Sequence, residues 1–240
     1  MKGLIEHIKK KTYKNVYLLS GEEPYLRLQY RDKLKAALVP EDDTMNINRF
    51  EGRESDEKAI LSLCDTMPFF GDRRLVVVEN SGFFASSGHD RLAEYLPDIP
   101  ETSFLIFVEE DVDKRGKLYK AVKKYGYAAE FAVPNDKVLM QWLASLAGKA
   151  GTLRYFLQLV AHDMFTMSME MEKLISYVGE RDVIEDADLE EICCVHVENK
   201  VFDMITEVLS GHQGRAMSLY KDLMALKEPP LRILYLFVLL

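Results

Sequence analysis

Short, continuous hydrophobic runs alternate with amphipathic segments over about the first 135 residues. The strongest runs are NVYLLSG, RLVVVEN and SFLIFVEE, which begin at residues 15, 74 and 103, and weaker ones are MNINRFEG at 45–52 and YAAEFAV at 127–133. Runs that are apolar throughout, rather than at alternate positions, are typical of strands covered on both faces of a parallel sheet. We therefore expect five strands in a sheet that is mainly parallel.

The segments between these runs have helical spacing. Residues 22–38 place Pro24 in a first turn and then carry hydrophobic residues at four-residue steps from Leu26 to Leu38. The segment 55–67 begins with Ser55 as an expected cap, and its expected apolar face consists of Ile60, Leu63, Cys64 and Met67. With crossover helices expected at 89–96 and 114–126, the pattern predicts a doubly wound α/β domain over residues 1–135.

The character of the chain changes after VPND at 133–136. Every later periodic segment has helical spacing, which predicts a small all-helical domain over 136–197. From 198 to 240 we expect two more helices separated by SGHQG and then the apolar run PPLRILYLFVLL. A helix that is apolar all round must be buried against another element, so we expect the chain to stop inside a third helical unit.

Composition and charge narrow the classes of function. The 240 residues are 48% hydrophobic and 29% charged, with a formal net charge of -8, which argues against a protein whose whole surface wraps nucleic acid. The three cysteines, two of them adjacent, do not form the paired framework of a secreted domain. With no apolar run of signal-peptide type near the N-terminus and no membrane-spanning segment, we expect a cytoplasmic protein.

The turn after the first strand, LLSGEEPYLR, stands where a phosphate-binding loop would lie. It lacks the G-x-x-x-x-G-K-[ST] spacing and its lysine, and it places Glu22 and Glu23 where an anion would bind. Glu79 alone, without that lysine loop, has no nucleotide to act on. The acidic stretch VEED at 108–111 can be a cation site, but a solvated loop is favoured because no second acidic cluster is evident. We therefore expect no catalytic site, no metal and no cofactor.

Two other clusters have ordinary structural explanations. Cys193, Cys194 and His196 have the residue types of a zinc site, but a helical spacing that favours one apolar helix face is shared by Leu189, Ile192, Cys193, His196 and Val197. A basic helix near 114–124 is favoured as a solvated face, with DNA contact as the alternative. Its lysines are Lys114, Lys117, Lys120, Lys123 and Lys124.

The stretch MPFFGDRR at 67–74 places two adjacent phenylalanines at a turn. Pro68 disfavours helical geometry at Met67, so Phe69 and Phe70 follow the last regular turn of the preceding helix. Both rings can fold back over the sheet edge, or they can form an exposed surface for a protein partner. The residues alone leave these two hypotheses open.

Three blocks resemble one known family. They are VYLLSGEEPYL, MPFFGDRRLVVVEN and the long segment from NKVFDMITEV to LRIL, and they occur in order across nearly the whole chain. The sequence is similar to the delta subunit of bacterial DNA polymerase III, the clamp-loading subunit that opens the sliding clamp. The resemblance implies an AAA+-like α/β domain without a functional phosphate loop, a lid-like helical domain and a C-terminal helical collar. It also implies no ATP hydrolysis by this chain, with nucleotidyltransferase activity belonging to the polymerase complex.

The resemblance also implies a site and partners. The residues at the family's clamp-contacting positions are Met67, Phe69 and Phe70, which would bind the sliding clamp, or beta subunit. Other partners would be the gamma/tau and delta-prime subunits, through a collar expected to be mostly missing here, and primed DNA within the complex. The alternatives are a nucleotide-binding regulator or enzyme on a doubly wound α/β domain, and a DNA-binding module.

Overall fold

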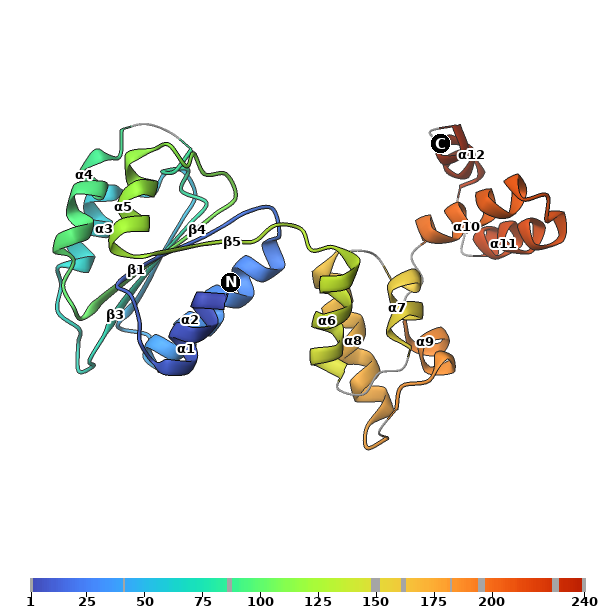
Figure 1. Cartoon of the computed structure of the whole chain (residues 1–240), viewed down its shortest axis with the longest axis horizontal. Coiled ribbons are helices and arrows are strands. Elements are labelled where there is room, and N and C mark those ends of the chain that lie inside the picture. The colour runs from blue at the N-terminus through green and yellow to red at the C-terminus, as the bar shows by residue number, and fades with distance from the viewer. Residues whose placement is uncertain are drawn as a thin grey trace. The chain divides into compact units, whose positions relative to one another are not determined.

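The computed structural model describes residues 2–40, 42–85, 88–147, 152–160, 163–181, 183–193, 197–225 and 229–238. By its internal contacts the chain divides into two compact units, Met1–Val133 and Pro134–Leu240. All the strands described lie in the first unit, and the second is helical (Figure 1). The further division of the second unit near residue 197 stays a prediction.

Five parallel strands form the centre of the first unit. They are β1 (Val16–Ser20), β2 (Ile47–Glu51), β3 (Arg74–Glu79), β4 (Ser103–Glu109) and β5 (Tyr127–Glu130), in the order β2-β3-β4-β1-β5. Every residue of β1, β3 and β4 is buried, which is why their sequences are continuous hydrophobic runs. The prediction of five strands is confirmed, and all four ladders between them are parallel.

Helices cover both faces of this sheet (Figure 1). On one side lie α3 (Glu57–Cys64), α4 (Asp90–Tyr95) with the short 3-10 helix η1 (Leu96–Asp98), and α5 (Lys117–Tyr125). Their apolar faces enclose a core with alternate residues of the strands, among them Val76 and Phe107. On the other side lie α1 (Lys2–Lys10), which the pattern did not predict, and α2 (Pro24–Leu38). The doubly wound α/β class is therefore confirmed.

The boundaries of α3 differ from the prediction. Asp56, not Ser55, caps the helix, because its carboxylate accepts a hydrogen bond from the Lys58 backbone N–H at 3.0 Å. Ser55 instead donates from its hydroxyl to the carbonyl oxygen of Gly52. The helix ends at Cys64, so Met67 lies beyond it and does not belong to its buried face.

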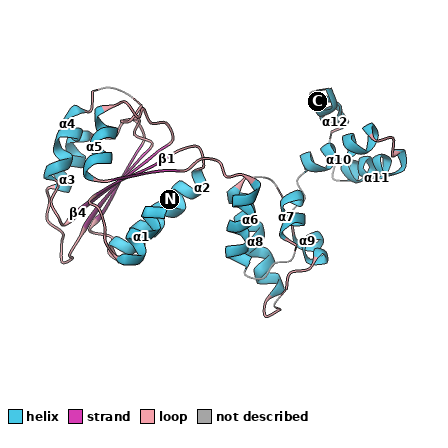
Figure 2. Ribbon diagram, viewed as in Figure 1, coloured by secondary structure: helices cyan, strands magenta, loops and turns pink. Residues whose placement is uncertain are grey.

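The second unit contains α6 (Asp136–Ala147), α7 (Leu153–Leu159), α8 (Met164–Val178), α9 (Asp186–Ile192), α10 (Val197–Leu209), α11 (Gln213–Ala225) and α12 (Pro230–Val238). Figure 2 shows only helices and loops in the described residues of this unit. Within those residues the prediction of a helical region after the sheet is confirmed. Among the described helices of the whole chain, none is long and apolar enough to cross a membrane.

The predicted helix face through Cys193 and Val197 is wrong. The helix α9 ends at Ile192, and Cys193 follows in an extended conformation with φ −76° and ψ 136°. Cys193 and Leu189 are buried, which agrees with a packing role. Cys194 and His196 lie outside the described residues.

Candidate protein-docking site

The turn between α3 and β3 exposes three large hydrophobic side chains. Met67 is 79% exposed, Phe69 51% and Phe70 97%. The two rings contact one another edge to face, with centroids 4.5 Å apart and planes at 76°. They therefore form a pair on the surface and do not fold back over the sheet edge, which was the other hypothesis from the sequence.

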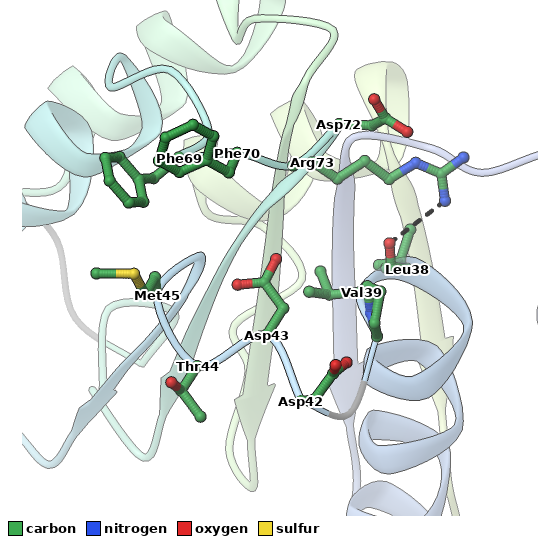
Figure 3. A pocket seen from close by; sticks show the side chains of 12 residues that line it. Leu38, Val39, Asp42, Asp43, Thr44, Met45, Phe69, Phe70, Asp72 and Arg73 are labelled. Carbon is green, nitrogen blue, oxygen red and sulfur yellow. Dashed lines mark hydrogen bonds between the residues drawn. The ribbon is translucent and has the colours of Figure 1, made fainter.

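A surface hollow of about 680 Å³ adjoins this pair. It lies between the turn and the loop that joins α2 to β2, and Figure 3 shows the side chains of both segments around it. Met45, 64% exposed, adds an exposed hydrophobic side chain from the facing loop. Asp42, Asp43 and Asp72 line the same hollow, so an apolar edge is combined with acidic walls.

The backbone of Phe69 is held by one buried side chain. The Phe69 N–H donates to Oδ1 of Asn46 at 2.7 Å, and the Asn46 Nδ2 donates to the carbonyl oxygen of Phe69 at 2.9 Å. The same Nδ2 donates to Oδ2 of Asp43 at 2.7 Å. The hydrogen bond from Asn46 lowers the pKa of the Asp43 carboxyl, because it stabilises the ionised form.

Arg74, the first residue of β3, holds the backbone of the residues that follow α3. Its Nε donates to the carbonyl oxygen of Thr66 at 2.9 Å and its Nη2 to that of Met67 at 3.1 Å. Its Nη1 donates to Oδ1 of Asn48 on β2 at 3.0 Å. The guanidinium is buried, and its fork of donors bonds two backbone carbonyls that follow α3.

Two further features shape the turn. Phe70 has φ +51°, a left-handed conformation that is unfavourable for a residue with a large side chain. Arg73 lies over the rings of Tyr13 and Phe104, 5.1 and 5.5 Å from their centroids, and donates to the carbonyl oxygen of Leu38 at 3.5 Å. The segment is therefore attached to the folded domain on both sides of Phe70.

The turn that resembles a phosphate loop is occupied by protein groups. The carboxylate of Glu23 caps α2 by accepting from the Tyr25 N–H at 3.0 Å, where a phosphate would need that donor. The Glu23 N–H donates to the carbonyl oxygen of Phe131 at 3.1 Å. A Cβ on Gly21 would stand 2.3 Å from the same carbonyl oxygen, so this turn is packed closely against the chain that follows β5.

The acidic residues at the carboxyl ends of the strands are also engaged. Glu79 on β3 accepts from Nη1 of Arg31 at 2.7 Å and from Nη2 of Arg49 at 2.6 Å. Glu109 on β4 accepts from the Ser81 N–H and hydroxyl and from the Gly82 N–H. Burial raises the pKa of Glu109, since it penalises the charged form. Within the described ranges there is no cluster of three metal-ligating side chains.

Ion pairs reduce the positive charge of the basic segment around α5. Lys114 pairs with Glu130 at 2.8 Å and Lys117 with Asp90 at 2.5 Å, and all four side chains are largely solvated. The interactions of exposed pairs of this kind are weak. They fit a solvated face, which was the favoured interpretation of these lysines.

The sequence singled out Met67, Phe69 and Phe70 but left the exposure of the two phenylalanines open, and it missed the residues around them. Asn46, Arg74 and Met45 were not singled out, because no local pattern links position 46 with position 69. Their proximity depends on the pairing of β2 with β3, in which Ile47 lies beside Leu75. The only available signal was a polar residue, Asn46, at the start of an expected strand.

The fold is that of a clamp-loader delta protein from Bacillus subtilis. The structures superpose with a TM-score of 0.77 at 24% identity, over 98% of this chain and 75% of that one. A gamma subunit-related protein of DNA polymerase III from Thermotoga maritima shares the fold more distantly, with a TM-score of 0.50 at 13% identity, over 92% of this chain and 77% of that one. These likenesses define the architecture, an α/β unit followed by helices.

Sequence comparison then gives the family. The model of "DNA polymerase III, delta subunit" matches residues 17–131, and that of the delta subunit's C-terminal domain matches residues 198–239. The DNA polymerase III subunit delta of Bacillus subtilis is 26% identical over 246 positions, covering 95% of this chain and 71% of its own length. A probable subunit delta of Aquifex aeolicus is 24% identical, covering 91% of this chain and 66% of its own length. The chain belongs to the DNA polymerase III delta subunit family.

Proposed function

We propose that this chain binds the sliding clamp of its organism through Met67, Phe69 and Phe70 and opens the ring as part of the clamp loader. The observation that carries the proposal is the pair of exposed phenylalanine rings on a turn whose backbone is fixed. Large apolar side chains of this kind are the usual anchors of a protein interface. The choice of the clamp as partner is supported by the similarity to a clamp-loader delta protein.

The exposure of the site supports binding of useful strength. Each phenylalanine ring contributes roughly 1.5–3 kcal/mol when it moves from water into an apolar pocket. Phe70 is 97% exposed and Phe69 51%, so most of this free energy is still available to a partner. Because their backbone is already ordered, little of it is spent on ordering the turn.

Ring opening requires differential affinity. A subunit that binds the closed and open clamps equally well changes neither population, however tightly it binds. In the proposed mechanism the side chains of Met67, Phe69 and Phe70 fit a surface of the clamp. That surface is fully available only when one subunit interface of the clamp is open. The free energy of docking then shifts the clamp toward its open form.

In this mechanism, control by nucleotide lies in partner subunits. In this chain the carboxylate of Glu23 caps α2, and Glu79 is bound by two arginines. Neither group is arranged to handle ATP. We therefore propose that the gamma/tau and delta-prime subunits provide the ATP-dependent step and that primed DNA is bound by the assembled loader.

The test is a binding titration of the full chain with its cognate clamp. Replacing both rings, in the variant Phe69→Ala plus Phe70→Ala, should weaken binding at least tenfold, with no change in thermal stability because the rings are exposed. The matched control is Tyr125→Ala plus Met169→Ala, which removes side chains of 40% and 65% exposure from other surfaces. If the wild type and the double phenylalanine variant bind the clamp with equal affinity, the proposal is refuted.

A further inference from the structure

We propose that Asn46 is the positioning residue of the docking site: its side-chain amide fixes the backbone of Phe69 and so presets the two rings for the clamp. The inference rests on the proposed function. Asn46 is fully buried and precedes β2, whereas the rings that it positions are exposed, and the first of them lies 23 residues later in the chain.

A continuous set of hydrogen bonds connects the sheet to the backbone of Phe69. The carbonyl oxygen of Asn46 accepts from the Leu75 N–H at 2.8 Å, which ties its backbone to β3. Its side chain then bonds both the N–H and the carbonyl oxygen of Phe69, as a neighbouring strand would. Asp43 orients the amide by accepting from Nδ2 at 2.7 Å and from the Asn46 N–H at 3.1 Å. The amide is therefore held in one orientation, and Phe69 with it.

The residues after Phe69 show that this arrangement is specific. Phe70 is held at φ +51°, which a free chain would leave because of steric repulsion between its side chain and backbone. At Gly71 a Cβ would stand 2.9 Å from Nδ2 of Asn46 and 3.2 Å from Oδ2 of Asp43. Only glycine leaves room for the pair at its present position. The glycine at position 71 is thus needed for the Asn46 amide to lie where it bonds Phe69.

This arrangement has a direct consequence for binding. A turn that must be ordered by the partner loses affinity in proportion to the conformations it gives up. Here the sheet has already ordered Phe69. Loss of the Asn46 amide should therefore weaken clamp binding even though the clamp-contacting side chains are unchanged.

The experiment compares four variants of the full chain, Asn46→Ala, Gly71→Ala, Phe70→Ala and Asn15→Ala. Two quantities are measured: affinity for the cognate clamp, and hydrogen exchange of the Phe69 amide by NMR. Asn15→Ala is the matched control, because the Asn15 amide also bridges a loop to the same domain, donating to the carbonyl oxygens of Pro100, Glu101 and Ser103. Gly71→Ala perturbs the Asn46 amide without removing it.

We expect Asn46→Ala to accelerate exchange of the Phe69 amide at least tenfold and to weaken clamp binding about three- to tenfold. Gly71→Ala should change both quantities in the same direction, and Asn15→Ala should change neither. Faster exchange with wild-type affinity would overturn the positioning role, as would an equal loss of affinity in Asn15→Ala. Wild-type affinity of Phe70→Ala would instead refute the proposed function, and the inference would fail with it.

Discussion

The guanidinium of Arg74 donates a hydrogen bond to the carbonyl oxygen of Met67 at 3.1 Å. A buried residue at the start of a central strand thereby holds the backbone of an exposed residue in the turn that follows α3. The neighbouring Nε holds the carbonyl oxygen of Thr66 in the same way. The exposed turn is therefore specified from inside the domain, and the stability of the domain depends on the same contacts.

Replacing Arg74 should destabilise the domain measurably. In Arg74→Lys a single ammonium cannot reach the three acceptors that the guanidinium serves, so part-buried hydrogen bonds of a buried residue are lost. The expected loss in free energy of unfolding is about 1–3 kcal/mol. Urea denaturation measures it.

The adjacent arginine gives the control. Arg73 makes cation–π contacts and one long hydrogen bond, so Arg73→Lys should cost less than about 1 kcal/mol. If the two variants lose equal stability, the three hydrogen bonds of Arg74 do not have the importance assigned to them.

The backbone conformation at position 70 should be less favourable for phenylalanine than for glycine. At φ +51° any side chain with a Cβ is strained, whereas glycine is not. Phe70→Gly should therefore be more stable than Phe70→Ala by about 1 kcal/mol. Both variants lack the ring, so the comparison isolates the backbone.

The measurement is the midpoint and slope of chemical denaturation for both variants. Both should also lose clamp affinity, because the side chain is the group proposed to dock. Greater stability of Phe70→Ala would indicate that the left-handed conformation is absent in solution.

The sequence predicts those parts of the structure that depend on residues close together in the chain. It does not predict those that depend on residues far apart in the chain. The strands β1, β3 and β4 were predictable because burial on both faces makes the whole run apolar. The exposure of Phe69 was not, since an aromatic residue between a helix and a strand can turn either way. The Asn46 amide that bonds its backbone reaches Phe69 only after β2 and β3 have paired.

The errors at the ends of α3 and α9 arise because the local sequence allows more than one cap or end point for a helix. Ser55 and Asp56 are both good caps, and the sequence does not say which will cap α3. In the structure the Ser55 hydroxyl bonds to Gly52, and the Asp56 carboxylate is left to cap the helix. At the C-terminus of α9, five residues with helical spacing extended the predicted helix beyond Ile192, because spacing alone does not show where a helix ends.

Glu79 should behave as a structural residue. Its side chain is 3% exposed and accepts from Arg31 and Arg49, so Glu79→Gln replaces one acceptor with an amide donor that faces a guanidinium. We expect a loss of about 1–3 kcal/mol in free energy of unfolding. Clamp affinity should be unchanged when it is measured well below the melting temperature.

Its neighbour across the sheet gives the matched control for this prediction. Glu51 pairs in register with Glu79 and contacts Arg49 at 3.1 Å, but its side chain is 60% exposed. Glu51→Gln should therefore cost no more than about 1 kcal/mol. Tight, Mg-dependent ATP binding that is lost in Glu79→Gln would contradict the structural role and favour a nucleotide-dependent function.

Cys64 should be nearly inert toward alkylation while the chain is folded. It is fully buried at the end of α3, and burial raises the pKa of its thiol to about 12 from the ordinary value of 9.0. Only the thiolate reacts, so at pH 8 the reactive fraction is lower by about a thousandfold, and the reagent must also reach a buried sulfur. Pulsed iodoacetamide labelling with site-resolved mass spectrometry, in native buffer and in denaturant, measures this protection.

The matched control is Ser62→Cys, whose thiol would lie on the exposed side of the same helix and should react at the ordinary rate. Comparable labelling of Cys64 and the Ser62→Cys thiol in native buffer would mean that the end of α3 opens readily, and the turn would then lack the rigid support on which its proposed docking role depends.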